Sequence, residues 1–152
     1  MTETAKQYLE QILTLDGMIQ NKLDEIFRLR SSIIMPSCQK NGDKVQTSVP
    51  SDRMADAISV IIGLEREYDV LICRYNDLRR DIFQKLSMMS YDKYRQILKM
   101  KYVDGKSIRR IAYELKMTER GCKKAHKRAL EEFYIIMEKC KIGIDNSLYP
   151  HV

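Results

Sequence analysis

Tryptophan is absent from this chain of 152 residues, and only three Phe, three Pro and six Gly are present. So little Pro and Gly leaves no room for a turn-rich β-fold, and Leu, Ile, Met and Tyr must supply the core. No apolar run approaches the roughly 18 residues needed to cross a bilayer. The first six residues lack the basic and then apolar pattern of a secretion signal. These absences predict an all-α, cytoplasmic protein with no membrane partner.

Cysteine is sparse, and its four copies, at positions 38, 73, 122 and 140, lack the paired spacing of zinc sites and disulfide frameworks. Cys122 and His126 stand four apart and could reach one metal ion, but without a second pair nearby we expect packing and no metal site. The sequence also shows no Gly-rich phosphate loop, no carboxylate cluster with metal spacing and no nucleophile paired with His. We therefore expect no enzyme, no catalytic residue and no cofactor.

Acidic residues are scarce in one part of the chain. Residues 1–89 hold 12 Lys and Arg against 13 Asp and Glu, a net charge of −1, whereas residues 90–152 hold 15 against 8, a net charge of +7. Between residues 93 and 128 the counts are 13 and 3, so a net charge of +10 falls within a quarter of the chain. This asymmetry indicates that the C-terminal half binds a polyanion. Double-stranded DNA is the partner we expect.

Apolar residues recur every seven positions over residues 6–34, in the alternating steps of four and three that are typical of a coiled-coil seam. The two rows of this seam are Ile12, Ile19, Ile26 and Ile33, and Tyr8, Leu15, Lys22 and Leu29. Lys22 interrupts the second row, and we expect its neighbour Leu23 to turn toward the seam in its place.

A second heptad run follows a polar stretch that we interpret as a loop over residues 35–51. Its rows are Met54, Ile61, Tyr68, Tyr75, Ile82 and Met89, and Ala57, Leu64, Leu71 and Leu78. Ile58, Ile62 and Ile72 widen the apolar stripe, as in a helix that packs on more than one partner. Residues 1–89 are therefore predicted to form a long, coiled-coil-like antiparallel hairpin that serves in oligomerisation or partner binding, with a homodimer favoured.

The basic half is predicted to hold short helices between residues 90 and 140. Ser90, Ser107 and Thr118 are in the right positions to cap the N-termini of three helices. Gly105, after Asp104, provides the left-handed residue that ends the first of them. Each capped N-terminus presents backbone N–H groups that suit phosphate binding.

The second and third of these helices are separated by a turn of only three residues, 116–118. Each has one apolar side, made by Ile108, Ile111, Ala112 and Leu115 in the second and by Cys122, Ala125, His126, Ala129, Leu130 and Phe133 in the third. Two short helices with a sharp turn, the later one basic, predict a helix-turn-helix that reads a DNA major groove. We expect His126 to be buried, neutral and hydrogen-bonded, and residues 141–152 to form a flexible tail.

Basic and polar residues of the last two helices are the candidates for DNA contact. Arg120, in the first turn of the third helix, is placed to bind guanine with two N–H groups. Glu119 would accept from a cytosine amine, although a Glu there also simply favours a helix N-terminus. Residues of the second helix should bind phosphates and fix register. The predicted interface is Lys106, Ser107, Arg109, Arg110, Thr118, Glu119, Arg120, Lys123, Lys124, Lys127 and Arg128.

Four short segments carry a resemblance to a known family: 102–107 (YVDGKS), 111–112 (IA), 115–118 (LKMT) and 127–130 (KRAL). Over roughly residues 91–133 the chain resembles region 4 of sigma-70-type factors, the helix-turn-helix that reads the −35 promoter element. The HKRAL ending and the long helical N-terminal half resemble small phage-encoded regulators of Gram-positive bacteria, the RinA and ArpU group of late-gene activators. Such a protein would act at the nucleoid of the bacterial host cell.

The chain departs from sigma-like recognition helices at Gly121-Cys122, where they usually carry Thr-Val. Gly121 has no side chain, so we expect the backbone to be able to approach DNA closely there. Nothing in the chain resembles the sigma region that melts promoters, so it is not a complete sigma factor.

Three functions remain open on the sequence. The first is a sequence-specific transcriptional regulator, a phage late-gene activator that acts at promoters with host RNA polymerase. The second is a small terminase-like protein of DNA packaging, which would form rings of about eight or more copies rather than dimers. The third is a sigma-mimicking binder of a host protein.

Overall fold

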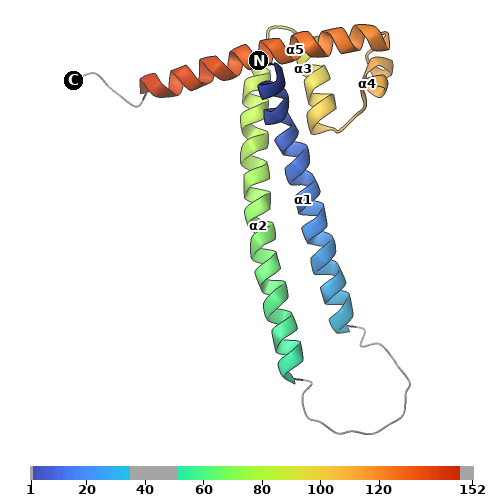
Figure 1. Ribbon diagram of the computed structural model, residues 1–152, viewed down its shortest axis with the longest axis vertical. Coiled ribbons are helices and arrows are strands. Elements are labelled where there is room, and N and C mark those ends of the chain that lie inside the picture. Colours follow the sequence, from blue (N-terminus) through green and yellow to red (C-terminus); the bar gives the residue numbers. More distant parts are fainter. Residues whose placement is uncertain (1, 35–50, 148–152) are drawn as a thin grey trace, which may run out of the picture. The chain divides into compact units, whose positions relative to one another are not determined.

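The computed structural model describes residues 2–34 and 51–147, which form helices and contain no strand (Figure 1). The predicted all-α class is confirmed. The elements in chain order are α1 (Thr2–Ile34), α2 (Ser51–Ser87), α3 (Asp92–Leu98), the π-helical turn η1 (Lys99–Val103), α4 (Ile108–Glu114) and α5 (Glu119–Ser147). No helix within the described residues is both long enough and apolar enough to cross a membrane.

The chain divides into two compact units, one from residues 15–74 and one from residues 1–14 and 75–152. The predicted boundary after residue 89 is therefore not where the units divide. The first turns of α1 and the last turns of α2 belong to the same unit as α3, α4 and α5, because their apolar residues share one core with α5.

The larger core lies in the unit of residues 1–14 and 75–152. It combines apolar residues from α1, α2, α3, η1 and the inner side of α5, and almost all of them are fully buried. They are Ala5, Leu9, Ile12, Ile82, Leu86, Met89, Leu98, Tyr102, Ala129, Leu130, Phe133 and Met137. Helix α5 thus packs against α1 residues that stand more than a hundred positions earlier in the chain.

A smaller core in the same unit holds α3, α4 and the start of α5 together. Its buried members are Ile97, Ile111, Ala112, Cys122 and Ala125. The apolar sides predicted for α4 and α5 are therefore the ones that pack. Tyr94, Met100, Ile108, Leu115 and Met117 are partly buried against this core.

In the unit of residues 15–74, α1 and α2 pack along the seam that the heptads predict. Ile19, Ile26 and Ile61 are its buried residues. Lys22 of α1 pairs with Glu67 of α2, while Arg30, farther along α1, pairs with Glu65. The partner position falls as the α1 position rises, so the two segments are antiparallel. Of the predicted loop 35–51, only Ser51 lies among the described residues, as the first residue of α2.

The expectation that Leu23 replaces Lys22 at the seam is wrong. Leu23 remains 43% exposed. The Lys22 amine lies 2.9 Å from Glu67 and 3.3 Å from Glu25. These carboxylates, Glu67 above all, raise the pKa of Lys22. A lysine is tolerated in this row because its methylene stem can pack along the seam while the paired amine stays near water.

Two predicted helix ends are also corrected. Ser90 does not cap α3: its backbone N–H donates to Glu132, 2.6 Å away, and α3 begins after Tyr91 without a side-chain cap. The third helix of the basic half is not short, since α5 runs for 29 residues to Ser147. It therefore includes the first seven residues of the predicted tail, and residues 148–152 lie outside the described part. Buried Phe133 and Met137 continue the apolar side of α5 and favour its extension.

Candidate nucleic-acid interface

The turn between α4 and α5 is as sharp as the sequence predicts. The N–H of Met117 donates to the carbonyl of Ala112 at 2.8 Å, which closes α4. Lys116 has φ of 51°, and among residues 2–34 and 51–147 it is the non-glycine residue with a left-handed backbone. That conformation costs a residue with a side chain roughly 1 kcal/mol. The predicted cap of α4 is confirmed, because the Ser107 hydroxyl accepts from the N–H of Arg110 at 3.3 Å.

Thr118 caps α5, also as predicted. Its hydroxyl accepts from the N–H of Gly121 at 3.1 Å, and its carbonyl accepts from Cys122 at 2.9 Å. A Cβ added at Gly121 would lie 3.0 Å from that hydroxyl oxygen. A side chain at position 121 would therefore crowd the Thr118 hydroxyl, which accepts the N–H of Gly121. The helix cap thus explains why a glycine stands there.

The exposed side of α5 carries a basic row. Arg120, Lys124 and Lys127 follow each other at i, i+4 and i+7, all exposed, on the side opposite the buried residues. The row spans about 10 Å, at 1.5 Å per residue. Lys123 and Arg128 extend it on its two flanks. This is the length of helix that fits along a few base pairs of a major groove.

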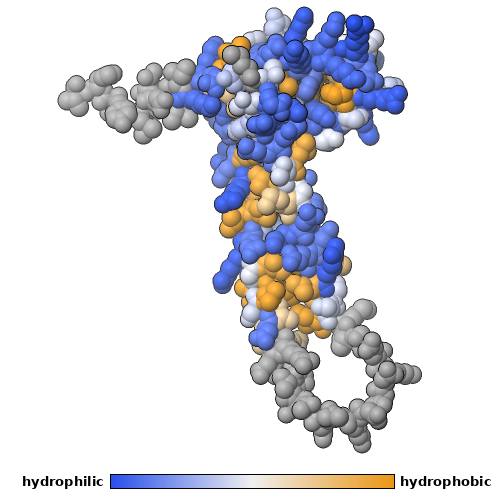
Figure 2. Space-filling view, in the orientation of Figure 1, coloured by the Kyte–Doolittle hydropathy of each residue, from blue (hydrophilic) through white to orange (hydrophobic). Residues whose placement is uncertain are grey.

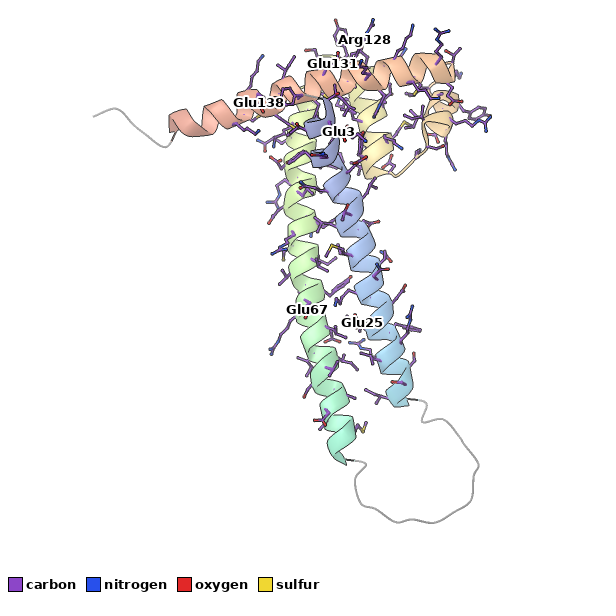
Figure 3. All side chains as sticks on the ribbon, in the orientation of Figure 1. Glu3, Glu25, Glu67, Arg128, Glu131 and Glu138 are labelled. Carbon is purple, nitrogen blue, oxygen red and sulfur yellow. The ribbon has the colours of Figure 1, made fainter. Side chains whose placement is uncertain are left out.

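The basic row ends abruptly. In the ten residues after Arg128, the charged side chains of α5 are all acidic, and Glu131 and Glu138 are two of them (Figure 3). The first ten residues of α5 therefore form a cationic segment and the following ten do not. Only the N-terminal part of this long helix suits a polyanion.

Two of the residues predicted to bind phosphates form ion pairs with a carboxylate of the protein itself. The Glu114 side chain lies 2.6 Å from the Lys106 amine and 3.1 Å from the Arg110 guanidinium. The hydrogen bond from Lys106, with that from Arg110, lowers the pKa of Glu114. We call this arrangement the Glu114 clamp. In this state it turns two cations of the predicted interface toward the protein's own carboxylate.

Glu119 is held in a similar way. It forms an ion pair of 2.8 Å with Lys123, and this contact lowers the pKa of Glu119. Lys123 is therefore partly neutralised in this state. Within the described residues, the other cations of the predicted interface form no ion pair; they are Arg109, Arg120, Lys124, Lys127 and Arg128. The structure thus divides the predicted site into cations that are open and cations that are already paired.

His126 and Cys122 lie on the inner side of α5, as predicted. The Nε2 of His126 is 3.1 Å from the hydroxyl of Tyr102, and burial, with nearby Lys101 and Lys6, lowers the pKa of His126. Burial also raises the pKa of the Cys122 thiol. Among the described residues, no group of three or more His, Cys, Asp or Glu side chains could hold a metal ion.

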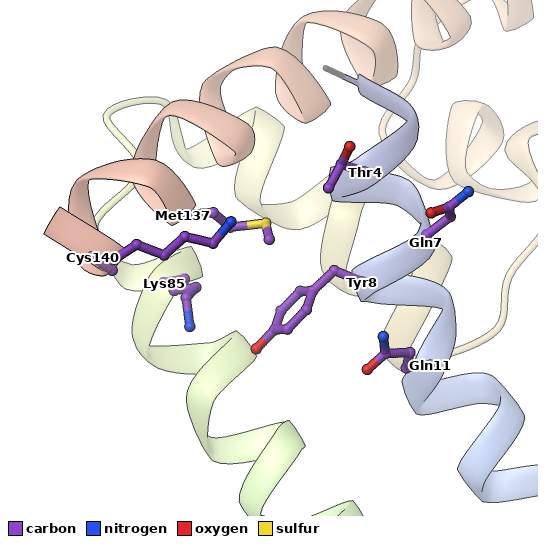
Figure 4. Close-up of a pocket in the computed structure, with 8 residues that line it drawn as sticks. Thr4, Gln7, Tyr8, Gln11, Lys85, Met137 and Cys140 are labelled. Carbon is purple, nitrogen blue, oxygen red and sulfur yellow. The ribbon is translucent and has the colours of Figure 1, made fainter. Parts of the chain in front are cut away.

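A hollow in the same unit does not resemble a ligand site. Residues of α1, α2 and α5 line it, including Tyr8, Lys85 and Met137 (Figure 4). The Tyr8 hydroxyl donates to Asp81, Lys85 pairs with the same carboxylate, and the Lys85 amine lies 5.3 Å from the centre of the Tyr8 ring. Because these polar groups are already paired with one another, we interpret the hollow as the edge of the core.

Comparison with known proteins agrees with this geometry. Residues 92–133 match a family described as Sigma-70, region 4. The chain contains a sigma-70 region 4-like helix-turn-helix. The matched segment covers α3, η1, α4 and the first half of α5, which together hold the basic row and the Glu114 clamp. Searches of curated proteins and of solved structures gave no match.

The family match indicates a general class of function. Region 4 is a DNA-binding domain of the transcription machinery and not an enzymatic family, so this domain indicates DNA binding connected with transcription.

Proposed function

We propose that this protein is a sequence-specific DNA-binding regulator of transcription that acts in the bacterial cytoplasm at the nucleoid. The basic row of Arg120, Lys124 and Lys127 supports this proposal most directly. It lies on the exposed side of α5, directly after a capped three-residue turn, where a helix-turn-helix places its groove-reading residues.

Arg120 has the role of base reading in this proposal. It stands in the first turn of α5, it is exposed, and it forms no ion pair within the described residues. Its planar guanidinium can therefore bind guanine through two N–H groups. Lys124, Lys127, Arg128 and Arg109 bind phosphates, which position the helix and make affinity depend on salt.

RNA polymerase of the host is the second partner we propose. The region 4-like helix-turn-helix supports this second partner, since such domains belong to the transcription machinery. The resemblance to phage late-gene activators favours activation over repression. Packaging proteins and sigma mimics remain outcomes of the tests below.

The test is selection of binding sites from a random DNA library with the purified full chain. The variant Arg120→Ala/Lys124→Ala removes two cations of the basic row. The matched control, Lys139→Ala/Lys141→Ala, removes the same charge from the same helix beyond its acidic segment. We expect a discrete motif with wild type and control, and loss of that motif in the basic-row variant.

Sequence-specific DNA recognition would be contradicted if binding were weak, were abolished by moderate salt and were unchanged in the basic-row variant. Retained binding to RNA polymerase without any DNA motif would identify a mimic. A native mass of about eight or more copies would favour a packaging protein, because such proteins form rings.

A further inference from the structure

The described residues of the unit 15–74, which are 15–34 and 51–74, expose more large apolar side chains than they bury. Three of their apolar residues are buried along the seam, whereas eight large ones are more than a third exposed: Met18, Leu23, Phe27, Met54, Ile58, Val60, Ile62 and Val70. Figure 2 shows apolar residues gathered in patches over α1 and α2. Two helices share only one seam, so an apolar stripe wider than the seam stays uncovered.

Four of these exposed residues belong to one continuous surface. Leu23 and Phe27 of α1 line one hollow, and Ile58 and Ile62 of α2 line the next. Arg30 lines both hollows and so joins them. We name Leu23, Phe27, Ile58 and Ile62 the apolar face. Phe27 is 71% exposed, which is unusual for an aromatic side chain without a partner.

The charges on this surface match a second copy of the same surface. Arg30 and Glu65 form an ion pair across α1 and α2, between the residues of the apolar face. In a contact with two-fold symmetry, each chain presents the same patch, so the Arg30 of each chain can meet the Glu65 of the other. With Asp24, which also lines the hollow beside Leu23 and Phe27, each patch holds one cation and two anions, a net charge of −1.

The surrounding charge does not favour a nucleic acid as the occupant. Residues 15–34 and 51–74 hold six Lys and Arg against eight Asp and Glu, a net charge of −2. A polyanion would be repelled weakly here, in contrast to the basic row. A near-neutral patch with its own paired charges suits a partner of the same composition.

We propose that two copies of this chain associate through the apolar face, with α1 and α2 segments of both chains forming a four-helix bundle. The second pair of helices covers the stripe that the first pair leaves exposed. This inference does not depend on DNA binding. Ten residues line the two hollows, which is between a third and a half of the roughly 20–30 residues that each partner gives to a standard interface. We therefore expect dissociation in the micromolar range.

The first test compares molar mass in solution for two matched variants at about 1–100 μM chain. Ile62→Glu places a charge within the apolar face. Val60→Glu is the control: it puts the same charge on the same helix, at a residue that is also exposed but points about 200° away. We expect dimers of wild type and Val60→Glu, and a dissociation constant raised about tenfold or more in Ile62→Glu. Circular dichroism verifies equal helix content.

The second test uses charge reversal at the centre of the face. With Asp24, Arg30→Glu leaves three anions on each patch, whereas Glu65→Arg leaves two cations and one anion, a net charge of +1. We expect each variant alone to be mainly monomeric, because like charges meet in the contact, and an equimolar mixture of the two to form heterodimers. A different protein as partner would not produce this recovery on mixing.

A wild-type chain that stays monomeric over the whole concentration range would overturn the proposal. So would dissociation by Val60→Glu and not by Ile62→Glu, which would place the contact on the other side of α2. Failure of the mixture to associate, with both single variants folded, would exclude a two-fold contact centred on Arg30 and Glu65.

Discussion

The hydroxyl of Tyr102 lies 3.1 Å from Nε2 of His126, and the two rings stack with centroids 5.7 Å apart. This pair joins η1 to the inner side of α5, directly behind the basic row. Tyr102 is 1% exposed, and burial raises its pKa to about 12, so its hydroxyl keeps its proton at neutral pH. Helix α5 is therefore joined to η1 by a part-buried polar contact.

Stability should fall in mild acid through His126. Its pKa is lower in the folded chain than the 6.5 of an unperturbed His, so the unfolded chain binds more protons once the pH drops below about 6.5. The contribution of neutral His126 is complete above that pH and is lost toward the lowered folded pKa. Thermal unfolding between pH 7.5 and 5.5 should show a falling midpoint. The positive charges of nearby Lys101 and Lys6 add to the effect of burial, because they also lower the pKa of His126.

His126→Gln keeps a side chain that can bond to the Tyr102 hydroxyl but does not titrate. We expect this variant to lose most of the difference between the two pH values. An equal fall of the midpoint in both proteins would show that other groups control the acid response.

Opening the Glu114 clamp should strengthen DNA binding. Glu114→Gln removes the carboxylate that holds Lys106 and Arg110, so both become free for phosphates without first breaking an ion pair. We expect the affinity for DNA to rise a few-fold. The affinity should also fall more steeply with salt concentration, by the equivalent of up to about two added phosphate contacts. Fluorescence anisotropy with a selected site measures both quantities.

Glu138→Gln is the control for the Glu114 clamp. Glu138 also forms an ion pair, with Lys141, but both residues lie on α5 beyond the segment that matches the family. This variant changes net charge by the same amount. Equal effects of the two variants would mean that overall charge acts, and that Lys106 and Arg110 do not contact DNA.

Two glycine substitutions should have opposite effects on stability. Gly105 has φ of +64°, and a Cβ there would meet only Leu13 at an ordinary 3.8 Å, so Gly105→Ala costs about 1 kcal/mol through backbone strain alone. Gly63 lies inside α2 with open space around it, so Gly63→Ala gains up to about 1 kcal/mol in helix propensity. Chemical denaturation of both variants tests the pair; changes of the same sign would contradict it.

Leu9 should matter for the DNA-binding domain although it stands near the start of the chain. It is fully buried in the core shared with Phe133 of α5. Leu9→Ala should cost roughly 2–5 kcal/mol and lower the temperature at which DNA binding is lost. Leu13→Ala, at a 38% exposed position one turn later, should have a small effect. Unchanged thermal loss of DNA binding in Leu9→Ala would show that the basic half is stable by itself.

The local parts of this fold could be predicted because neighbouring residues determine them. Heptad spacing identified the long helices, and Ser107, Thr118 and Gly105 marked helix ends through their own side chains or their lack of one. The segments of the helix-turn-helix were recognisable for the same reason. Ser90 misled because its backbone N–H is taken by Glu132, far along the chain.

The sequence by itself determined the class of fold, the position of the turn and which face of α5 is basic, since these follow from periods of three to seven residues. Only the tertiary structure decided which cations of the predicted interface are free of ion pairs and that Lys22 keeps its place at the seam. It also decided that the first turns of α1 and the last turns of α2 share a core with α5. Contacts such as Tyr8 with Asp81 join residues 73 positions apart. Such pairings depend on how whole helices pack, which no local pattern specifies.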